Sequence, residues 1–173
     1  SLCEFVHFPV QAGANRVLKK MHRKYTKEEY LEKVRIFREI CPNVSLGTDI
    51  IVGFPTETAE EFQETYDIMK EIEYDVAFLF AYSPRKGTPS SRWEDDVPHE
   101  EKQRRLQELL SLHKEICNKQ RQRMIGETVE VLVGRQNAKD STFLSGHTRC
   151  WKNVIFPGKE EFIGTLQQVK IEN

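Results

Sequence analysis

The segment TDIIVGFPTET, at residues 48–58, constrains the fold more than any other part of the sequence. A short, mostly apolar run at residues 49–52 stops at a Gly-Phe-Pro turn, and helical periodicity follows from about residue 59. This order is typical of a strand and helix in a parallel sheet. Gly53 permits close approach of backbone or ligand, and Pro55 fixes the direction in which the chain leaves. Since α/β folds bind ligands at the carboxyl ends of their strands, the segment is either a ligand site or an ordinary connecting loop.

Two further strands are predicted, at residues 3–10 and 76–82, and a helical pattern follows each of them. Capping boxes begin helices after Thr26 and Thr58, because the Thr hydroxyl and a Glu three residues later satisfy free backbone amides. Residues 76–82 are almost all apolar, so we expect this strand to be covered on both faces. Series of βα units form either doubly wound sheets or barrels, and three units are too few to close a barrel.

A long helix is predicted from about residue 98 to residue 124, where Gly126 interrupts the pattern. Its expected apolar face consists of Leu106, Leu109, Leu110, His113, Ile116 and Cys117. Beyond Gly126 the period changes to two, with short strands at residues 128–133, 143–148, 154–156 and 162–171. This pattern predicts a small antiparallel β-barrel, of the five-stranded OB-like type. We therefore expect two domains, residues 1–125 and residues 126–173.

Charge and cysteine placement narrow the class of protein. A net charge of −1 hides two basic stretches, residues 16–27 and 104–123, which either meet phosphate or form solvated helix faces. Cys3, Cys41, Cys117 and Cys150 are too dispersed to predict a zinc or iron–sulfur site. Dispersed thiols, with no signal peptide or long apolar span, indicate the cytoplasm and no membrane association. The chain starts at Ser1, directly ahead of an expected strand, which is typical of a fragment.

Three blocks of this sequence resemble radical-SAM methylthiotransferases. HFPVQAG at residues 7–13 is similar to their HLPVQSG, DIIVGFPTET at residues 49–58 to DIIVGFPGET, and YSPRKGTP at residues 82–89 to YSPRPGTP. The β module resembles a TRAM domain, and the blocks follow the family's order over essentially the whole chain. They are most similar to the branch that methylthiolates isopentenyladenosine beside the tRNA anticodon, while the threonylcarbamoyl-adenosine branch remains open.

This resemblance implies half of a radical-SAM (β/α) barrel followed by a TRAM domain. The intact enzyme of the family uses S-adenosylmethionine and two [4Fe-4S] clusters, whose cysteines all lie upstream of residue 1. We therefore expect no cluster in this chain, no activity of the chain alone, and a missing N-terminal half. The implied partner is the tRNA anticodon stem–loop. The alternatives are a non-catalytic RNA-binding module and self-association through exposed strand edges.

The resemblance also implies cofactor-binding residues, although it assigns none a catalytic role. The superfamily runs a G-x-I-x-G-x-x-E strand along the adenosyl group of the cofactor. Ile51 and Gly53 fit this pattern, Asp49 stands at the first Gly, and Thr56 stands where the Glu would be, with Glu57 one residue later.

Two more polar contacts and a set of RNA-binding residues complete the predictions. Gln11 and Asp49 are expected to hydrogen-bond the ribose or amino-acid portion of the cofactor, and Arg85 to meet a carboxylate or phosphate. In the TRAM-like module, Trp151 is either a stacking partner for bases or a core residue. RNA contacts are predicted for Arg135, Lys139, Arg149 and Lys152.

Overall fold

The computed structural model describes residues 3–172 and divides the chain into two compact units. We call residues 7–42 and 46–118 the β/α unit, and the remainder (up to residue 6, residues 43–45 and from residue 119 onward) the β unit. Among the described residues, no helix is both long enough and apolar enough to cross a lipid bilayer.

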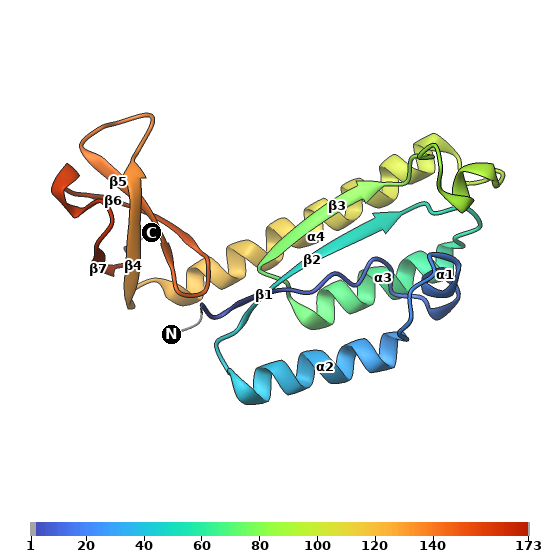
Figure 1. Cartoon of the computed structure of the whole chain (residues 1–173), viewed down its shortest axis with the longest axis horizontal. Helices are drawn as coiled ribbons and strands as arrows, with labels where there is room; N and C mark the ends of the chain where they lie inside the picture. The colour runs from blue at the N-terminus through green and yellow to red at the C-terminus, as the bar shows by residue number, and fades with distance from the viewer. Residues whose placement is uncertain (1–2, 173) are drawn as a thin grey trace. The chain divides into compact units, whose positions relative to one another are not determined.

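The first half of the chain contains a three-stranded sheet of order β1-β2-β3 (Figure 1). Its strands are β1 (Phe5–His7), β2 (Ser45–Val52) and β3 (Val76–Ala81). β2 and β3 pair in parallel from Gly47 opposite Val76 to Val52 opposite Ala81. The helices are α1 (Asn15–Lys20), α2 (Lys27–Ile40), α3 (Ala59–Ile72) and α4 (His99–Met124). The three βα units confirm the predicted partial (β/α) barrel.

The first strand is shorter than the predicted residues 3–10. Pro9 has no backbone N–H, and the Val10 N–H donates to the Thr48 hydroxyl at 3.0 Å instead of to a strand carbonyl. Pairing resumes at Gln11, whose N–H donates to the Asp49 carbonyl and whose carbonyl accepts from the Ile51 N–H. The chain therefore follows β2 without forming a continuous ladder.

Both predicted capping boxes are present. The hydroxyl of Thr26 accepts the Glu29 N–H at 3.2 Å, and the hydroxyl of Thr58 accepts the Glu61 N–H at the same distance. In each case the Glu carboxylate accepts the N–H of the capping Thr at 2.9 Å. These reciprocal bonds fix where α2 and α3 begin, and so fix how the chain leaves the strand ends.

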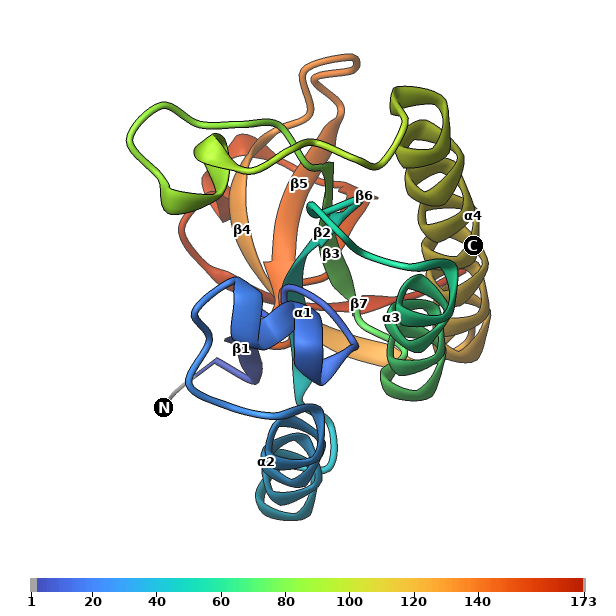
Figure 2. The same ribbon diagram turned by 90° about the vertical axis from the view of Figure 1, so that its right-hand side faces the viewer.

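The two faces of the sheet differ in burial, which corrects the prediction for β3. Helices α2, α3 and α4 lie along one face (Figure 2), where Leu46, Ile50 and Val52 are buried. On the other face Phe78 and Phe80 are 51% and 52% exposed. The continuous apolar run of β3 therefore fits a strand with only one face covered in this chain, not both.

The buried stripe of helix α4 shares only Leu109 and Ile116 with the predicted one. The buried positions are Lys102, Arg105, Leu109, Leu112 and Ile116, a spacing of three and four residues. Leu110, predicted to be apolar core, is 43% exposed. The buried stripe therefore begins with two cations, and it is these that reach the candidate site.

The β unit holds a curled antiparallel sheet of order β6-β5-β4-β7. Its strands are β4 (Thr128–Gln136), β5 (Phe143–Thr148), β6 (Asn153–Pro157) and β7 (Leu166–Lys170). Val131, Val133, Leu144 and Val154 form its buried face. The described residues form four strands, one for each of the four predicted segments, and not the five of the OB-like type. The last strand is shorter than the predicted residues 162–171, and a 3-10 turn, Glu160–Phe162, precedes it.

Candidate functional site

The tip of β2 is a fixed left-handed turn. Gly53 has φ +67°, a conformation that side-chain-bearing residues rarely adopt. The Val52–Gly53 peptide is held from both sides: its carbonyl accepts the Tyr82 N–H at 2.8 Å, and its N–H donates to Glu57 Oε2 at 2.6 Å. A Cβ at position 53 would lie 2.3 Å from Cγ of Lys102. Both the conformation and the space therefore require glycine.

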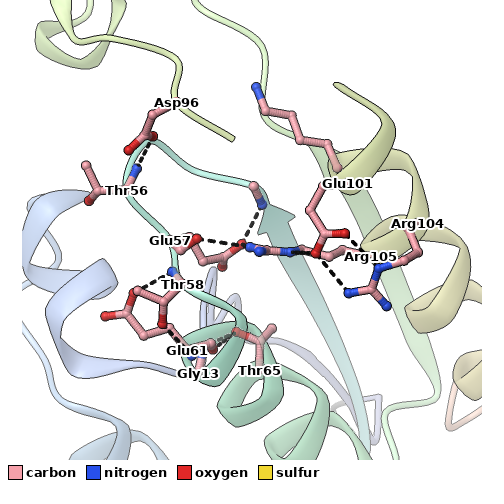
Figure 3. Close-up of polar contacts among 12 residues, drawn as sticks. Gly13, Thr56, Glu57, Thr58, Glu61, Thr65, Asp96, Glu101, Arg104 and Arg105 are labelled. Carbon is pink, nitrogen blue, oxygen red and sulfur yellow. Dashed lines mark hydrogen bonds and ion pairs between the residues drawn. The ribbon is translucent and has the colours of Figure 1, made fainter. Parts of the chain in front are cut away.

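Glu57 and Arg105 form a buried ion pair behind this turn (Figure 3). Their side chains are 0% and 5% exposed, and Arg105 Nη1 lies 2.8 Å from Glu57 Oε2. Arg105 Nη1 also donates to the Glu57 carbonyl at 3.2 Å, and Nε donates to Glu101 Oε1 at 2.7 Å. Burial raises the pKa of Glu57, while the Gly53 N–H and Arg105 oppose that rise.

Thr56 is the second left-handed residue of the segment, with φ +72°. Its N–H donates to Asp96 at 2.6 Å (Figure 3), and its hydroxyl accepts from Lys20 Nζ at 2.6 Å and Arg16 Nη1 at 3.2 Å. Arg16 also bonds both carboxylate oxygens of Glu61, the capping residue of α3. Thr56 therefore joins α1, the approach to α4 and the β2 tip.

Aromatic rings enclose the tip next to Gly53. Phe54 is buried and packs edge-to-face on Tyr82 and Trp93, with centroids at 5.1 and 5.8 Å. Lys20 lies 5.5 Å from the Trp93 ring, and Lys102 lies 5.2 Å from the Tyr82 ring. The tip is thus a packed, cation-rich structure.

The open face of the sheet carries the polar groups nearest to this tip. His7 Nε2 lies 3.4 Å from Asp49 Oδ2, and the two side chains are 40% and 32% exposed. Asp49 is opposite Phe78 and Ile51 is opposite Phe80 in the parallel register. This arrangement presents a carboxylate, an imidazole and apolar surface together on one accessible face.

The structure brings four of the five predicted cofactor residues into one neighbourhood. Asp49 and Ile51 lie on β2, Gly53 directly follows the strand, and Gln11 is bridged to Ile50. Gln11 is only 6% exposed and has φ +68°. The fifth residue, Arg85, is exposed in the loop after β3. Its backbone carbonyl accepts hydrogen bonds from the N–H and the hydroxyl of Thr88, at 3.1 and 2.8 Å.

The predicted RNA-binding residues fall at opposite ends of the β4–β5 ladder. Arg135 is opposite Ser145, and Lys139 follows in the β4–β5 turn, whereas Arg149 and Lys152 lie in the β5–β6 turn. Ser145 and Arg149 are four residue steps apart, about 13 Å of extended chain.

The β5–β6 turn is also partly occupied by contacts within the β unit. Arg149 Nε lies 3.2 Å from Glu4, and its Nη1 lies 3.8 Å from Glu130. Trp151 is 52% exposed, and its ring stacks on His147 with a centroid distance of 4.4 Å. An exposed, stacked Trp151 is not a core residue.

Two segments of the chain match known protein families. The Radical SAM superfamily matches residues 2–69, and the TRAM domain matches residues 122–173. A tRNA-2-methylthio-N(6)-dimethylallyladenosine synthase of Protochlamydia amoebophila is 70% identical over 171 residues, which are 99% of this chain and 38% of that protein. The enzyme of the same name from Desulfitobacterium hafniense is 45% identical over 172 residues, with the same two shares.

The chain is similar to radical-SAM methylthiotransferases. It matches the C-terminal portion of these relatives and spans 38% of their length. Coproporphyrinogen III oxidase from Escherichia coli, a Radical SAM enzyme, shares the fold: the TM-score is 0.56 at 17% identity, covering 84% of this chain and 41% of that one.

The similarity to these relatives implies S-adenosylmethionine and iron–sulfur clusters in the intact enzyme. A half-exposed apolar strand end with a glycine turn and an accessible carboxylate fits the adenosyl part of that cofactor. A cluster does not fit: within residues 3–172 no three His, Cys, Asp or Glu side chains lie together as a metal site would require. None of Cys3, Cys41, Cys117 and Cys150 forms a disulfide.

Sequence reasoning did not find the two cations of α4 or the role of Glu57. Lys102 and Arg105 carry a signal, because they continue the three-and-four spacing of Leu109, Leu112 and Ile116 toward the helix start. A cation on a buried stripe requires a buried partner. Glu57, the residue displaced by one from the superfamily Glu, is that partner.

Proposed function

We propose that this chain is the C-terminal portion of a tRNA methylthiotransferase that adds a methylthio group to isopentenyladenosine beside the anticodon. The observation that carries this proposal is the 70% identity, over 99% of the chain, to a relative named for that product. The dimethylallyl name of the relatives favours this branch over the threonylcarbamoyl-adenosine branch.

In this proposal the tip of β2 faces S-adenosylmethionine. Ile51 would lie against the adenine, at the strand end that the Gly53 turn holds in place. Asp49 and Gln11 would hydrogen-bond the ribose or amino-acid portion, and Arg85 would pair with the carboxylate. When bound, the cofactor supplies the radical chemistry together with two [4Fe-4S] clusters, whose ligands we place outside this chain.

The open face of the sheet supports a missing N-terminal half. Phe78 and Phe80 are each more than half exposed, and Ile51 and the His7–Asp49 pair lie on the same face. The chain spans 38% of its relatives, so the remaining strands of a barrel would cover this surface. If a second copy covered it instead, light scattering of the isolated chain would give a dimer rather than a monomer.

We propose that the β unit binds the anticodon stem–loop in the cytoplasm, with the domain division at residues 125 and 126. Arg135, Lys139, Arg149 and Lys152 would contact phosphates, and Trp151 offers an exposed aromatic edge. A titration of tRNA across salt concentrations tests this part: binding that weakens with salt supports phosphate contacts. Binding by this chain alone, unaffected by S-adenosylmethionine, would also be expected of a non-catalytic RNA-binding module.

The activity itself is tested in an intact enzyme that carries this segment. Expressed in cells that lack methylthiotransferase activity, it is expected to restore 2-methylthio-isopentenyladenosine, detected by mass spectrometry of tRNA nucleosides. The isolated chain is expected to be inactive. Methylthiolation of threonylcarbamoyl-adenosine only would overturn the substrate, and cleavage of S-adenosylmethionine by the isolated chain would overturn its assignment as an incomplete site.

A further inference from the structure

The Glu57–Arg105 pair is an unusual means of holding a turn. Both charges are almost fully buried, and within the described residues Glu57 Oε1 has no hydrogen-bond partner. Burying two charges carries a large desolvation cost, and well-packed apolar residues often stabilise a fold equally well. A buried carboxylate oxygen without a partner adds to that cost. Stability alone therefore does not account for this arrangement.

The geometry shows what the pair controls. Glu57 Oε2 accepts two hydrogen bonds, one from Arg105 on α4 and one from the Gly53 N–H on the β2 tip. The other side of the same peptide, the Val52 carbonyl, is held by Tyr82 at the end of β3. The orientation of the Val52–Gly53 peptide plane thus depends on Glu57 at one side and on β3 at the other.

Arg105 in turn has little freedom to move. Its Nη1 contacts both the carboxylate and the carbonyl of Glu57, and its Nε is bonded to Glu101 one turn earlier on α4. Lys102, on the same face of α4, packs its stem beneath Gly53 and pairs with Asp95. The β2 tip is therefore fixed to α4 by two adjacent, buried cationic side chains.

We propose that Glu57, paired with Arg105, is a positioning residue that fixes the Val52–Gly53 peptide plane and thereby the surface that the β2 tip offers to S-adenosylmethionine. This inference rests on the proposed function, because it requires the tip to face the cofactor. Glu57 does not contact the cofactor in this arrangement. It acts through the Gly53 peptide, so its loss is expected to affect cofactor affinity more than the chemical step.

The test compares Glu57→Gln with Thr58→Ala in an intact enzyme that carries this segment. Thr58→Ala removes the cap of α3, next to the tip, without touching the Gly53 peptide. We expect Glu57→Gln to raise KM for S-adenosylmethionine about tenfold with a smaller change in kcat, since small displacements of binding groups cost this much. Thr58→Ala is expected to lower the thermal stability about as much as Glu57→Gln does, and to leave KM for S-adenosylmethionine unchanged.

A spectroscopic measurement on the present chain gives an independent readout. The short bond to a carboxylate is expected to shift the Gly53 amide proton downfield in a nitrogen–proton NMR spectrum, and Glu57→Gln is expected to move it back. Arg105→Lys, which keeps the charge, should retain more of the shift and of the affinity than Arg105→Met. These two variants also provide the test if Glu57→Gln does not fold.

The outcomes separate this inference from the proposed function. Equal KM values for Glu57→Gln and Thr58→Ala, or an unchanged Gly53 amide resonance, would overturn the positioning role. If Gly53→Ala in the folded intact enzyme also leaves KM unchanged, the β2 tip does not face the cofactor and the proposed site is wrong. If Gly53→Ala raises KM and Glu57→Gln does not, only the positioning role is wrong.

Discussion

The turns after β2 and β3 occupy equivalent places in the sheet and are built in opposite ways. Each contains a glycine with positive φ, +67° at Gly53 and +93° at Gly87, close to a proline. Gly53 is buried beside Lys102, whereas no described atom lies within 4 Å of a Cβ added at Gly87. The β2 turn is therefore buried and tightly packed, whereas the β3 loop is exposed and loosely packed. The similar Gly and Pro content of the two turns does not show which one is tightly packed. The contact of Gly53 with Lys102 on α4 does.

Substitution of Gly53 should give the largest effect. Gly53→Ala forces a side chain into the left-handed region and against the Lys102 stem, which is buried and pinned by Asp95. We expect a loss of about 3 kcal/mol in the free energy of unfolding, measured by urea denaturation followed by circular dichroism. A loss below about 1 kcal/mol would show that the β2 turn is no more tightly packed than the β3 loop.

Gly87→Ala is the matched substitution in the open loop. The added methyl group meets no described atom, so only the backbone conformation opposes it. The expected loss is about 1 kcal/mol in the same measurement. Equal losses at positions 53 and 87 would contradict the difference between the two turns.

Two variants of Thr56 separate its hydroxyl from its backbone strain. Thr56→Val keeps a branched side chain at φ +72° and removes the acceptor of Lys20 and Arg16, so we expect a loss of about 1 kcal/mol. Thr56→Gly also removes the hydroxyl but relieves the strain, and should stay within about 0.5 kcal/mol of the unmodified chain. Thermal unfolding measures both, and a Gly variant less stable than the Val variant would contradict the strain argument.

As the pH falls, the β2 turn should lose stability before the β3 loop does. Of the effects on stability predicted for the two turns, this one should be the smallest. Arg104 and Arg105 lower the pKa of Glu101 to about 2. Since this pKa is depressed in the folded state, the stabilisation is complete above the unfolded pKa near 4.5 and is lost as the pH falls toward 2. Because Glu101 is partly exposed, the loss should stay below about 1 kcal/mol. Glu101→Gln should flatten the pH dependence of the unfolding midpoint between pH 4.5 and pH 2. An unchanged slope would contradict a stabilising role of the Glu101 carboxylate.

The sequence predicts most of the local structure because local rules decide it. The capping boxes at Thr26 and Thr58 each depend on residues three apart, and both are present. The break at Gly126 and the change of period correctly separate α4 from the strands of the β unit. The family blocks also lead to the radical-SAM and TRAM assignments that the comparisons support.

Features that depend on distant partners were not predictable from pattern alone. The apolar run of β3 indicates burial on both faces, but Phe78 and Phe80 leave one face of the strand about half exposed. The predicted stripe of α4 shares Leu109 and Ile116 with the buried one and lacks Lys102 and Arg105, because a cation does not indicate burial unless its partner is known. The partner of Arg105 lies 48 residues earlier, and no local period links such a pair.

The aromatic contacts of the two units have a practical consequence for following how the chain unfolds. The sequence contains two tryptophans, and each unit has one: Trp93 packs on Phe54 in the β/α unit, and Trp151 stacks on His147 in the β unit. Trp93→Phe and Trp151→Phe therefore each leave a single tryptophan, in one unit or the other, which can be excited selectively over the five tyrosines. Emission from each variant would report the melting of one unit alone, and coincident curves would mean that both units unfold in a single cooperative transition.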